Sequence, residues 1–514
     1  MTTPTSTRDP KPGLGRHVRA LTAFASAEEG RPALLGFLGA SLITVGGLGA
    51  GSTRLHDPLL ESLHLSWLRF GHGLVLSSVL LWAGVALMLV AWLWLGRRVV
   101  ATTAGRRAGA QRPGDVSEFT MVATTGFWLM PLLLSVPVFS RDTYSYLAQG
   151  ALLRDGFDPY VVGPIDNPNS LLDNVSPIWT TTTAPYGPAF ILIAKFVTIV
   201  IGDDVIAGTM LLRLCMLPGL VLLIWAAPRV ARHVGANGAA ALWICVLNPL
   251  VIIHLMGGVH NEMLMVGLMM AGIALTVADR PAWGVVLVAL AVAVKATAVI
   301  ALPFMVWMWM NRVRDRRQLS PIRAFATATA ASIAIFGVVF AVVSWLAGVG
   351  LGWLTALAGS VKIVNWLTLP TAAANLVNAV GGLFVPVNFY AVLDVTRIVG
   401  IAIIAICLPL LWWRFRHDDR QALTGIALAM LVLVLFLPAA LPWYYTWPLA
   451  VLSVLAQSRA AIAVIAGFST WIMVVFKPDG SHGMYSWLHV LLATACAVAA
   501  WYSLAKAPIR EPDQ

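Results

Sequence analysis

The stretch from residue 140 to 187 combines carboxylates, aromatic rings and hydroxyl groups in one largely polar segment. It reads SRDTYSYLAQGALLRDGFDPYVVGPIDNPNSLLDNVSPIWTTTTAPYG. Aromatic rings stack on the CH faces of sugars, and carboxylates accept the protons of sugar hydroxyls, so this mixture indicates a carbohydrate-binding surface. The alternative is an acid-rich, solvated loop whose Tyr and Trp side chains lie in the interfacial belt of a membrane. The candidate sugar-binding and acceptor-binding residues in this stretch are Tyr144, Tyr146, Gln149, Asp158, Tyr160, Trp179 and Tyr186.

Asp142 is the candidate catalytic residue of this stretch. It follows the apolar run 119–139 within three residues, so its carboxylate is expected at the membrane surface, where a lipid-linked substrate would present its head group. A partly desolvated carboxylate there can act as a general base toward an acceptor hydroxyl. The alternative for a lone acid at a helix end is an ordinary helix cap or a charge in water.

Several ionisable groups lie within or between apolar runs. Arg213 lies inside the run 205–227, Lys295 lies inside AVAVKATAVIALP, and Lys362 lies on a neighbouring loop. Ionisable groups within membrane spans are costly and usually face a functional cavity. We therefore predict a cationic site for a phosphate leaving group beside Asp142. Each group alone could instead snorkel to the interface or pack between helices. The predicted phosphate-binding residues are Arg213, Lys295, Lys362 and His260, and the adjacent Asn261 and Glu262 are grouped with the sugar-binding residues.

A second aromatic cluster lies in the segment LPAALPWYYTWPLA, residues 437–450. Prolines and aromatic rings at the end of an apolar run are typical of an interfacial belt. That interpretation is favoured for Trp443, Tyr444, Tyr445 and Trp447, with a lipid or sugar groove as the alternative.

Long apolar runs must position these residues. The chain of 514 residues is 59% hydrophobic and 11% charged, whereas soluble proteins carry roughly 25% charged residues. Apolar runs of spanning length predict an all-α polytopic membrane protein with about fourteen transmembrane helices. No polar stretch is long enough for a separate soluble core, so residues 31–505 form one membrane domain between tails at 1–30 and 506–514. The runs lie at 32–51, 73–95, 119–139, 205–227, 237–256, 262–279, 281–300, 300–311, 324–345, 395–413, 421–437, 443–457, 460–476 and 484–505.

The distribution of Lys and Arg sets the expected orientation. With both termini in the cytoplasm, most of the 34 basic residues fall in cytoplasmic segments, including the loops around 97–112 and 312–317, as the positive-inside rule requires. The net charge of +11 is therefore topological, and no nucleic-acid partner is implied. This orientation holds only if 188–202 and 367–385 are re-entrant or juxtamembrane helices at the outer face. The stretch 140–187 then becomes the first large extracytoplasmic loop.

The cysteines indicate neither a disulfide framework nor a zinc site. All four lie inside apolar runs without paired spacing: Cys215, Cys245, Cys407 and Cys496. No cofactor is expected.

The segments RDTYSYLAQGALLRDGFDPYVVGP, SPIW followed by APYGP, GGVHNEMLMVGL, VKATAVIALP, NWLTLPT and PWYYTWPL resemble those of the actinobacterial polyprenol-phosphate-mannose-dependent α-1,6-mannosyltransferases. That family belongs to the GT-C glycosyltransferase superfamily. The resemblance covers residues 30–505, and its most specific part runs from Asp142 to Pro188. The other segments are shared more widely among GT-C enzymes.

The resemblance implies a GT-C fold and an inverting enzyme of the cell (inner) membrane. Mannose would pass from polyprenyl-phosphate-mannose to a lipid-anchored α-1,6-mannan, the backbone of lipomannan and lipoarabinomannan, at the extracytoplasmic face. Asp142 would be the catalytic base, and no metal is implied because no second acid adjoins it. Two alternatives stay open: a GT-C arabinofuranosyltransferase using polyprenyl-phosphate-arabinose, and a transporter or flippase of a lipid-linked sugar. A transporter typically has two related halves with broken helices near the bilayer midplane, and no such halves are visible in this sequence.

Overall fold

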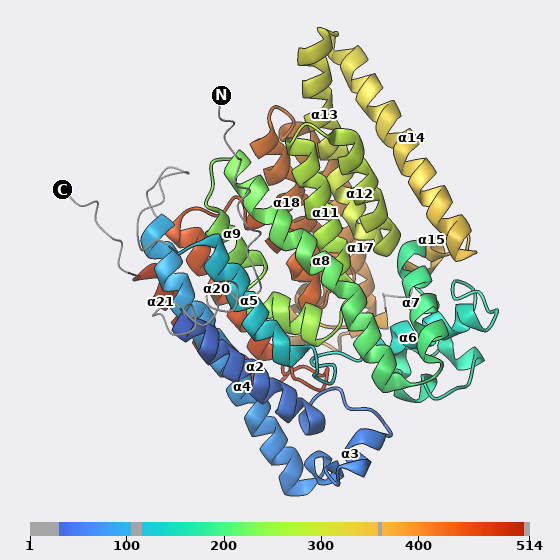
Figure 1. Ribbon diagram of the computed structural model, residues 1–514, viewed down its shortest axis with the longest axis vertical. Coiled ribbons are helices and arrows are strands. Elements are labelled where there is room, and N and C mark those ends of the chain that lie inside the picture. Colours follow the sequence, from blue (N-terminus) through green and yellow to red (C-terminus); the bar gives the residue numbers. More distant parts are fainter. Residues whose placement is uncertain (1–29, 104–115, 358–361, 508–514) are drawn as a thin grey trace, which may run out of the picture.

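The computed structural model describes residues 30–103, 116–357 and 362–507, and in those ranges the regular secondary structure is helical apart from one isolated bridge between Phe476 and His482. Most of the predicted tails, 1–30 and 506–514, lies outside the described residues, as does much of the basic loop around 97–112. Figure 1 shows long helices packed side by side, with short helices gathered around α6 and α7.

Eight helices of the described chain are long and apolar enough to cross a membrane, or nine if one bent pair counts as a span. The prediction of an all-α, multi-pass membrane protein is thus confirmed. The spans lie in α2 (Gly30–Ala50), α4 (Gly71–Thr103), α8 (Val205–His233), η6 (Ala296–Ile300) continued by α13 (Ala301–Arg317), α14 (Pro321–Ala347), α17 (Phe389–Arg414), α18 (Asp419–Phe436) and α21 (Trp487–Ala505).

The predicted number of about fourteen spans is not confirmed, because several apolar runs form helices shorter than the roughly 20 residues that a bilayer needs. Those of 10–17 residues are α7 (Pro188–Ile201), α11 (Glu262–Val277), α12 (Pro281–Val294) and α20 (Arg459–Val475). The run 237–256 is broken into α9 (Gly238–Cys245), α10 (Pro249–Val251) and the π-helix η5 (Ile252–Gly257). In the run 237–256, α9 ends at Cys245 and Pro249 begins α10, and in the run 281–300, α12 ends before the extended Lys295.

The remaining elements are short helices that connect or cover the spans. They are α3 (Pro58–Ser62), η1 (Ser66–Arg69), α5 (Glu118–Leu132), α6 (Asp142–Arg154), η2 (Pro164–Asp166), η3 (Leu172–Asn174), η4 (Pro177–Trp179), α15 (Trp353–Ala356), α16 (Leu369–Gly381), η8 (Pro442–Tyr445) and α19 (Thr446–Leu452). Helices α7 and α16 correspond to the two segments predicted not to cross. With 14 residues, α7 is about 21 Å long, shorter than a hydrocarbon core of about 30 Å.

Helix α11 lies at the centre of the bundle, and nearly all of its residues are buried. It packs closely on α8, since a Cβ atom on Gly267 would lie 2.0 Å from the carbonyl oxygen of Gly219. Glycine at both positions lets the two backbones touch. The packing fixes the N-terminal end of α11, which carries His260, Asn261 and Glu262.

One end of the bundle is tied together by ion pairs between loops that the sequence predicts to be cytoplasmic. The pairs are Arg232 with Glu118, His233 with Asp419, Arg312 with Asp419 and Asp279, and Arg316 with Asp279. They join the ends of α5, α8, α13 and α18 and the turn between α11 and α12. The basic loop around 312–317 therefore lies beside the start of α18 and the turn between α11 and α12.

Candidate active site

Asp142 is the first residue of α6, and the backbone before it is tightly constrained. Phe139 has a φ of 67° and donates its N–H to the carbonyl of Pro478 at 2.7 Å. Arg141 donates to the carbonyls of Thr53 and Asn174, both at 2.9 Å. The Asp142 side chain is 13% exposed. A carboxylate at a helix N-terminus is stabilised by the helix dipole. The turn before α6 therefore holds Asp142 in a defined, largely buried position.

The side chain of Asp142 lines an open cavity of about 330 Å³. The cavity walls come from segments far apart in the sequence, and they mix aromatic, hydroxyl, amide and carboxylate groups. The lining includes Ser140, Asp142, Ser176, Trp179, Asn365, Trp443, Asp479, Ser481 and His482. This composition fits a carbohydrate ligand, which combines apolar CH faces with hydroxyl groups.

His260 lies directly beside Asp142. Its Nδ1 atom is 3.7 Å from Asp142 Oδ2 and 3.5 Å from the hydroxyl of Tyr146. The imidazole stacks on Trp443 with ring centroids 3.7 Å apart. The π-helix η5 and a φ of 57° at Val259 bring His260 to this position. Both are uncommon backbone features that cluster at functional sites.

Lys295 forms an ion pair with the fully buried Glu262. Helix α12 ends at Val294, and Lys295 adopts an extended conformation that turns the chain. The ammonium group lies 4.4 Å from the ring centroid of Tyr444, 5.4 Å from that of Trp447 and 5.9 Å from that of Tyr186. A cation held over aromatic faces is stabilised in a partly dry site. The ion pair and the three rings are called the lysine cage below.

The favoured interpretation of Trp443, Tyr444, Tyr445 and Trp447 as an interfacial belt is therefore wrong for this cluster. Trp443 packs against His260, and Tyr444 and Trp447 belong to the lysine cage. Tyr445 is buried and donates its hydroxyl proton to the carbonyl of Leu367 at 2.7 Å. These aromatic side chains therefore pack against His260 and Lys295 inside the protein.

Burial, and after it the negative charge of Glu262, raise the pKa of Asp142, while the positive charge of Lys295 and the hydrogen bond from Ser140 lower it. The net effect moves this pKa from 3.8 to about 7. A carboxyl group with a pKa near neutrality can both accept and release a proton under ordinary conditions.

The structure does not place Arg213 at the cavity. This side chain is fully buried, and its guanidinium donates to the carbonyls of Met256 at 3.0 Å, Leu133 at 2.6 Å and Ser135 at 2.7 Å. All three guanidinium nitrogens are thus engaged by backbone. Arg213 holds η5 and the end of α5 together through these hydrogen bonds. Its role is therefore structural, and it does not line the cavity as a phosphate ligand would.

The other candidate residues divide into two groups. Tyr144 donates to the carbonyl of Ser52 at 2.6 Å, Asp158 accepts from the N–H of Tyr160 at 2.9 Å, and Lys362 donates to Thr182 at 3.0 Å. The Tyr160 hydroxyl donates to the carbonyl of Tyr186 at 2.9 Å. These bonds stabilise the loop and do not put the side chains on the cavity surface.

The second group lies nearer the cavity. Trp179 lines it, and Tyr146 and Tyr186 pack edge to face against each other. Gln149 Oε1 and both amide atoms of Asn261 are buried without a hydrogen-bond partner in the described chain.

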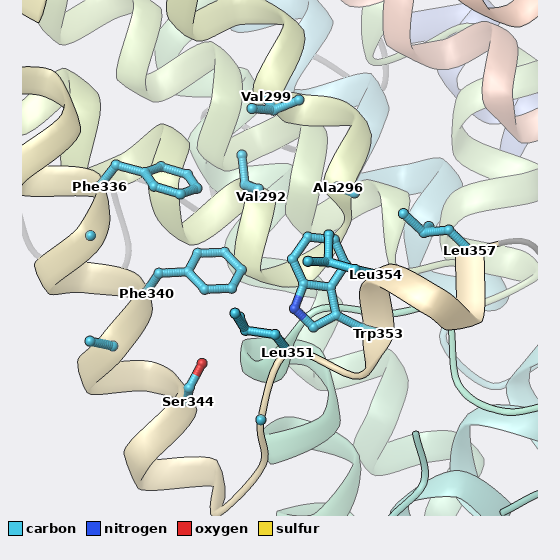
Figure 2. A pocket seen from close by; sticks show the side chains of 13 residues that line it. Val292, Ala296, Val299, Phe336, Phe340, Ser344, Leu351, Trp353, Leu354 and Leu357 are labelled. Atoms are coloured by element: carbon cyan, nitrogen blue, oxygen red, sulfur yellow. The ribbon is translucent and has the colours of Figure 1, made fainter. Parts of the chain in front are cut away.

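An apolar groove of about 740 Å³ begins next to the lysine cage. Ala296, which directly follows Lys295, is part of its lining. Figure 2 shows side chains from α12 and η6, from α14 and from α15 converging on the same space. The groove is lined by Val292, Ala296, Val299, Phe336, Gly337, Phe340, Ala341, Ser344, Gly350, Leu351, Trp353, Leu354 and Leu357.

The sequence does not identify the segment Phe476–His482 as part of the site, although residues of this segment line the cavity together with Trp179. Its Pro478-Asp479-Gly480 sequence is a turn signal, but a turn signal does not indicate which other segment the turn will contact. Asn365, within the segment NWLTLPT, also lines the cavity.

Residues 33–311 match the family model described as "Alpha-(1->6)-mannopyranosyltransferase, N-terminal domain", and residues 370–506 match the "MptB C-terminal domain". The chain is 68% identical over 505 residues to Alpha-(1->6)-mannopyranosyltransferase A of Mycobacterium tuberculosis, covering 98% of this chain and 95% of that one. It is 38% identical over 472 residues to the protein of the same name from Corynebacterium glutamicum, covering 90% and 95%.

Among solved structures, the chain is similar to the apo oligosaccharyltransferase of Archaeoglobus fulgidus, with a TM-score of 0.36 and 12% identity, covering 84% of this chain and 57% of that one. The family models and the two relatives cover both the segment that carries Asp142 and the segment that carries Trp443. The chain belongs to the alpha-(1->6)-mannopyranosyltransferase family.

Proposed function

We propose that this mannosyltransferase takes mannose from polyprenyl-phosphate-mannose and adds it, with inversion, to a lipid-anchored α-1,6-mannan at the extracytoplasmic face. Family membership supports α-1,6-mannosyl transfer. The polyprenyl-phosphate-mannose donor, the mannan acceptor and the extracytoplasmic face of the membrane go beyond what family membership supports, and we propose them here. The observation that carries it is the position of Asp142, a largely buried carboxylate between a polar cavity and the lysine cage.

Asp142 is the general base of the proposed reaction. Its carboxylate accepts the proton of the acceptor O6 hydroxyl as O6 forms a bond to C1 of the donor mannose. The bond between C1 and the phosphate oxygen breaks at the same time, and its electron pair leaves with the polyprenyl phosphate. One displacement at C1 inverts the β-linked donor to an α-linked product. His260, 3.7 Å from Asp142, orients the carboxylate, and Asn261 supplies unpaired polar atoms toward the sugars.

Lys295 binds the polyprenyl phosphate, which is the leaving group. This group gains negative charge as the C1–O bond breaks, and a cation placed there in advance stabilises that charge. Glu262 pairs with Lys295 and holds it in the lysine cage while no phosphate is bound. We propose Lys295 as the main phosphate ligand in place of Arg213, whose guanidinium is occupied by backbone carbonyls.

The apolar groove beside Ala296 is the proposed place of the polyprenyl chain. An isoprenoid chain carries no polar groups beyond its phosphate, and almost all the side chains lining the groove are apolar. Because Ala296 adjoins Lys295, a chain lying in the groove (Figure 2) would leave its phosphate near the lysine cage. We favour an enzyme over a transporter because family membership supports α-1,6-mannosyl transfer.

Purified protein in lipid nanodiscs, supplied with polyprenyl-phosphate-mannose and a short α-1,6-mannoside, tests the proposal. Asp142→Asn should lower the rate by about 100-fold to 10,000-fold, the usual worth of a general base. The matched control is Asp173→Asn, an exposed acid of the same loop, which should keep the wild-type rate. Wild-type turnover by Asp142→Asn would contradict the assignment of the base. Consumption of polyprenyl-phosphate-arabinose alone would overturn the donor, and movement of the lipid-linked sugar without transfer would favour a flippase.

A further inference from the structure

The segment Val475–Gly483 forms a tight hairpin at the end of α20. Lys477 donates its N–H to the carbonyl of Ser481, and Gly483 donates to the carbonyl of Val475, both at 2.8 Å. Asp479 Oδ1 accepts from the N–H and the hydroxyl of Ser481, at 3.0 and 2.8 Å. Gly480 has a φ of 95°, a conformation that favours glycine. The turn is therefore well defined, and we call it the 475–483 hairpin.

This hairpin sits directly on the segment that presents Asp142. Pro478 accepts the N–H of Phe139 at 2.7 Å. A Cβ atom on Gly480 would lie 3.5 Å from the Cα of Ser140, so the tip of the hairpin is in contact with the residues before α6. Its far side is held by Trp366, which donates its indole N–H to the carbonyl of Met484 at 3.0 Å. The hairpin thus has a fixed place beside the proposed base.

The hairpin lines the cavity that contains Asp142, together with Ile178 and Trp179 of the first loop. Asp479 is exposed, and His482 Nδ1 is buried without a hydrogen-bond partner in the described chain. An unpaired buried nitrogen is costly unless a ligand or water pairs with it. The wall therefore offers a carboxylate and an imidazole to whatever occupies the cavity.

Charge and location decide which substrate belongs there. The cavity holds two carboxylates, Asp142 and Asp479, while the guanidinium of Arg141 is engaged by backbone carbonyls. An anionic phosphate is disfavoured beside two acids, whereas a neutral sugar with many hydroxyl donors is favoured. Lys295 and the apolar groove do not line this cavity. At about 330 Å³, it falls in the range of about 300–1,000 Å³ typical of small-molecule sites.

We infer that the 475–483 hairpin is the acceptor-binding wall of the active site, with Asp479 and His482 binding hydroxyl groups of the mannan and Trp179 stacking on a sugar ring. This inference rests on the proposed function, because it takes the acceptor to be a mannan and Asp142 to be the base. Asp479 and His482 are binding residues for the acceptor and take no part in bond breaking.

The test measures the acceptor and the donor separately. In nanodiscs, Asp479→Asn and His482→Ala should each raise the KM for α-1,6-mannotriose by about tenfold, the worth of one strong hydrogen bond. The KM for the donor should stay at the wild-type value. Asp479→Asn keeps an oxygen that can accept from Ser481, so the turn survives, and the unchanged donor KM reports an intact fold. Asp173→Asn is the matched control and should change neither constant.

Equilibrium binding of α-1,6-mannotriose without donor separates this inference from the proposed function. Weaker binding in both variants supports the acceptor wall even if wild-type protein fails to consume polyprenyl-phosphate-mannose, a failure that would overturn the proposed donor alone. The acceptor wall is overturned if wild-type protein does not bind mannotriose, or if both variants keep the wild-type affinity and acceptor KM. A rise in donor KM equal to the rise in acceptor KM would also overturn it, since it would indicate a general structural role.

Discussion

The pH dependence of mannosyl transfer is the sharpest consequence of the surroundings of Asp142. A general base acts in its ionised form, and the ionised fraction rises with pH, so activity should rise with pH through the pKa. With a pKa of about 7, only about 3% of Asp142 is ionised at pH 5.5. An ordinary Asp with a pKa of 3.8 would be almost fully ionised at that pH. The buried setting therefore predicts a loss of about thirtyfold in kcat/KM between pH 9, where Asp142 is fully ionised, and pH 5.5.

The two charged neighbours of Asp142 should shift this profile in opposite directions. Glu262→Gln removes a negative charge that raises the pKa, so the midpoint should move to lower pH. Lys295→Gln removes a positive charge that lowers the pKa, so its midpoint should move to higher pH even though transfer itself becomes slower. Glu118→Gln, at the far end of the bundle in an ion pair with Arg232, is the matched control and should leave the midpoint unchanged.

Initial rates at low substrate concentration between pH 5 and 9 measure kcat/KM and hence the titration of the free enzyme. A flat profile down to pH 5 would refute the raised pKa of Asp142. Shifts of the same sign in Glu262→Gln and Lys295→Gln would refute the electrostatic reasoning, because it requires opposite signs.

Three further perturbations test the framework around the site. Arg213→Met should lower the free energy of unfolding by about 3–5 kcal/mol, because it strips a buried network of backbone carbonyls of their donor, as measured by thermal unfolding in nanodiscs; an unchanged midpoint would contradict the bracing role. Phe340→Ala should weaken use of a long polyprenyl donor more than that of a short-chain donor, whereas Ile333→Ala, on an exposed part of the same helix, should affect neither; equal effects of the two changes would argue against the groove. Gly267→Leu should prevent folding, since even a Cβ there would lie 2.0 Å from the Gly219 carbonyl, and expression at wild-type levels with full activity would contradict the close packing of α8 and α11.

Asp142, His260 and Lys295 could be singled out from the sequence, because ionisable side chains at or within apolar runs are rare enough to be informative. The contacts that these side chains make could not be predicted from the sequence. An Arg inside a span can bind phosphate or satisfy broken backbone, and only the path of η5 determines that Arg213 does the second. The partner of Lys295 is Glu262, which lies in another helix, and nothing in the local sequence indicates that pairing.

The predicted number of about fourteen spans is not confirmed for a related reason. Hydropathy detects apolar residues, but it does not detect where a helix ends within an apolar run. Lys295 adopts an extended conformation in the middle of one such run, and Asn248 begins a new short helix in another. Aromatic residues are equally ambiguous, because the sequence around Trp443 would look the same whether its ring lay at a lipid interface or stacked on His260. Only the contacts between distant segments of the chain distinguish the two positions.

The seating of the 475–483 hairpin against α6 has a consequence for how the enzyme is made. Asp142 leaves the ribosome well before the hairpin, because residues 475–483 lie more than 300 residues further along the chain. A nascent chain therefore carries the proposed base before the hairpin that contacts the residues preceding it. The cavity beside Asp142 is complete only once the 475–483 hairpin has been made, so a product truncated before residue 475 would lack part of the cavity lining.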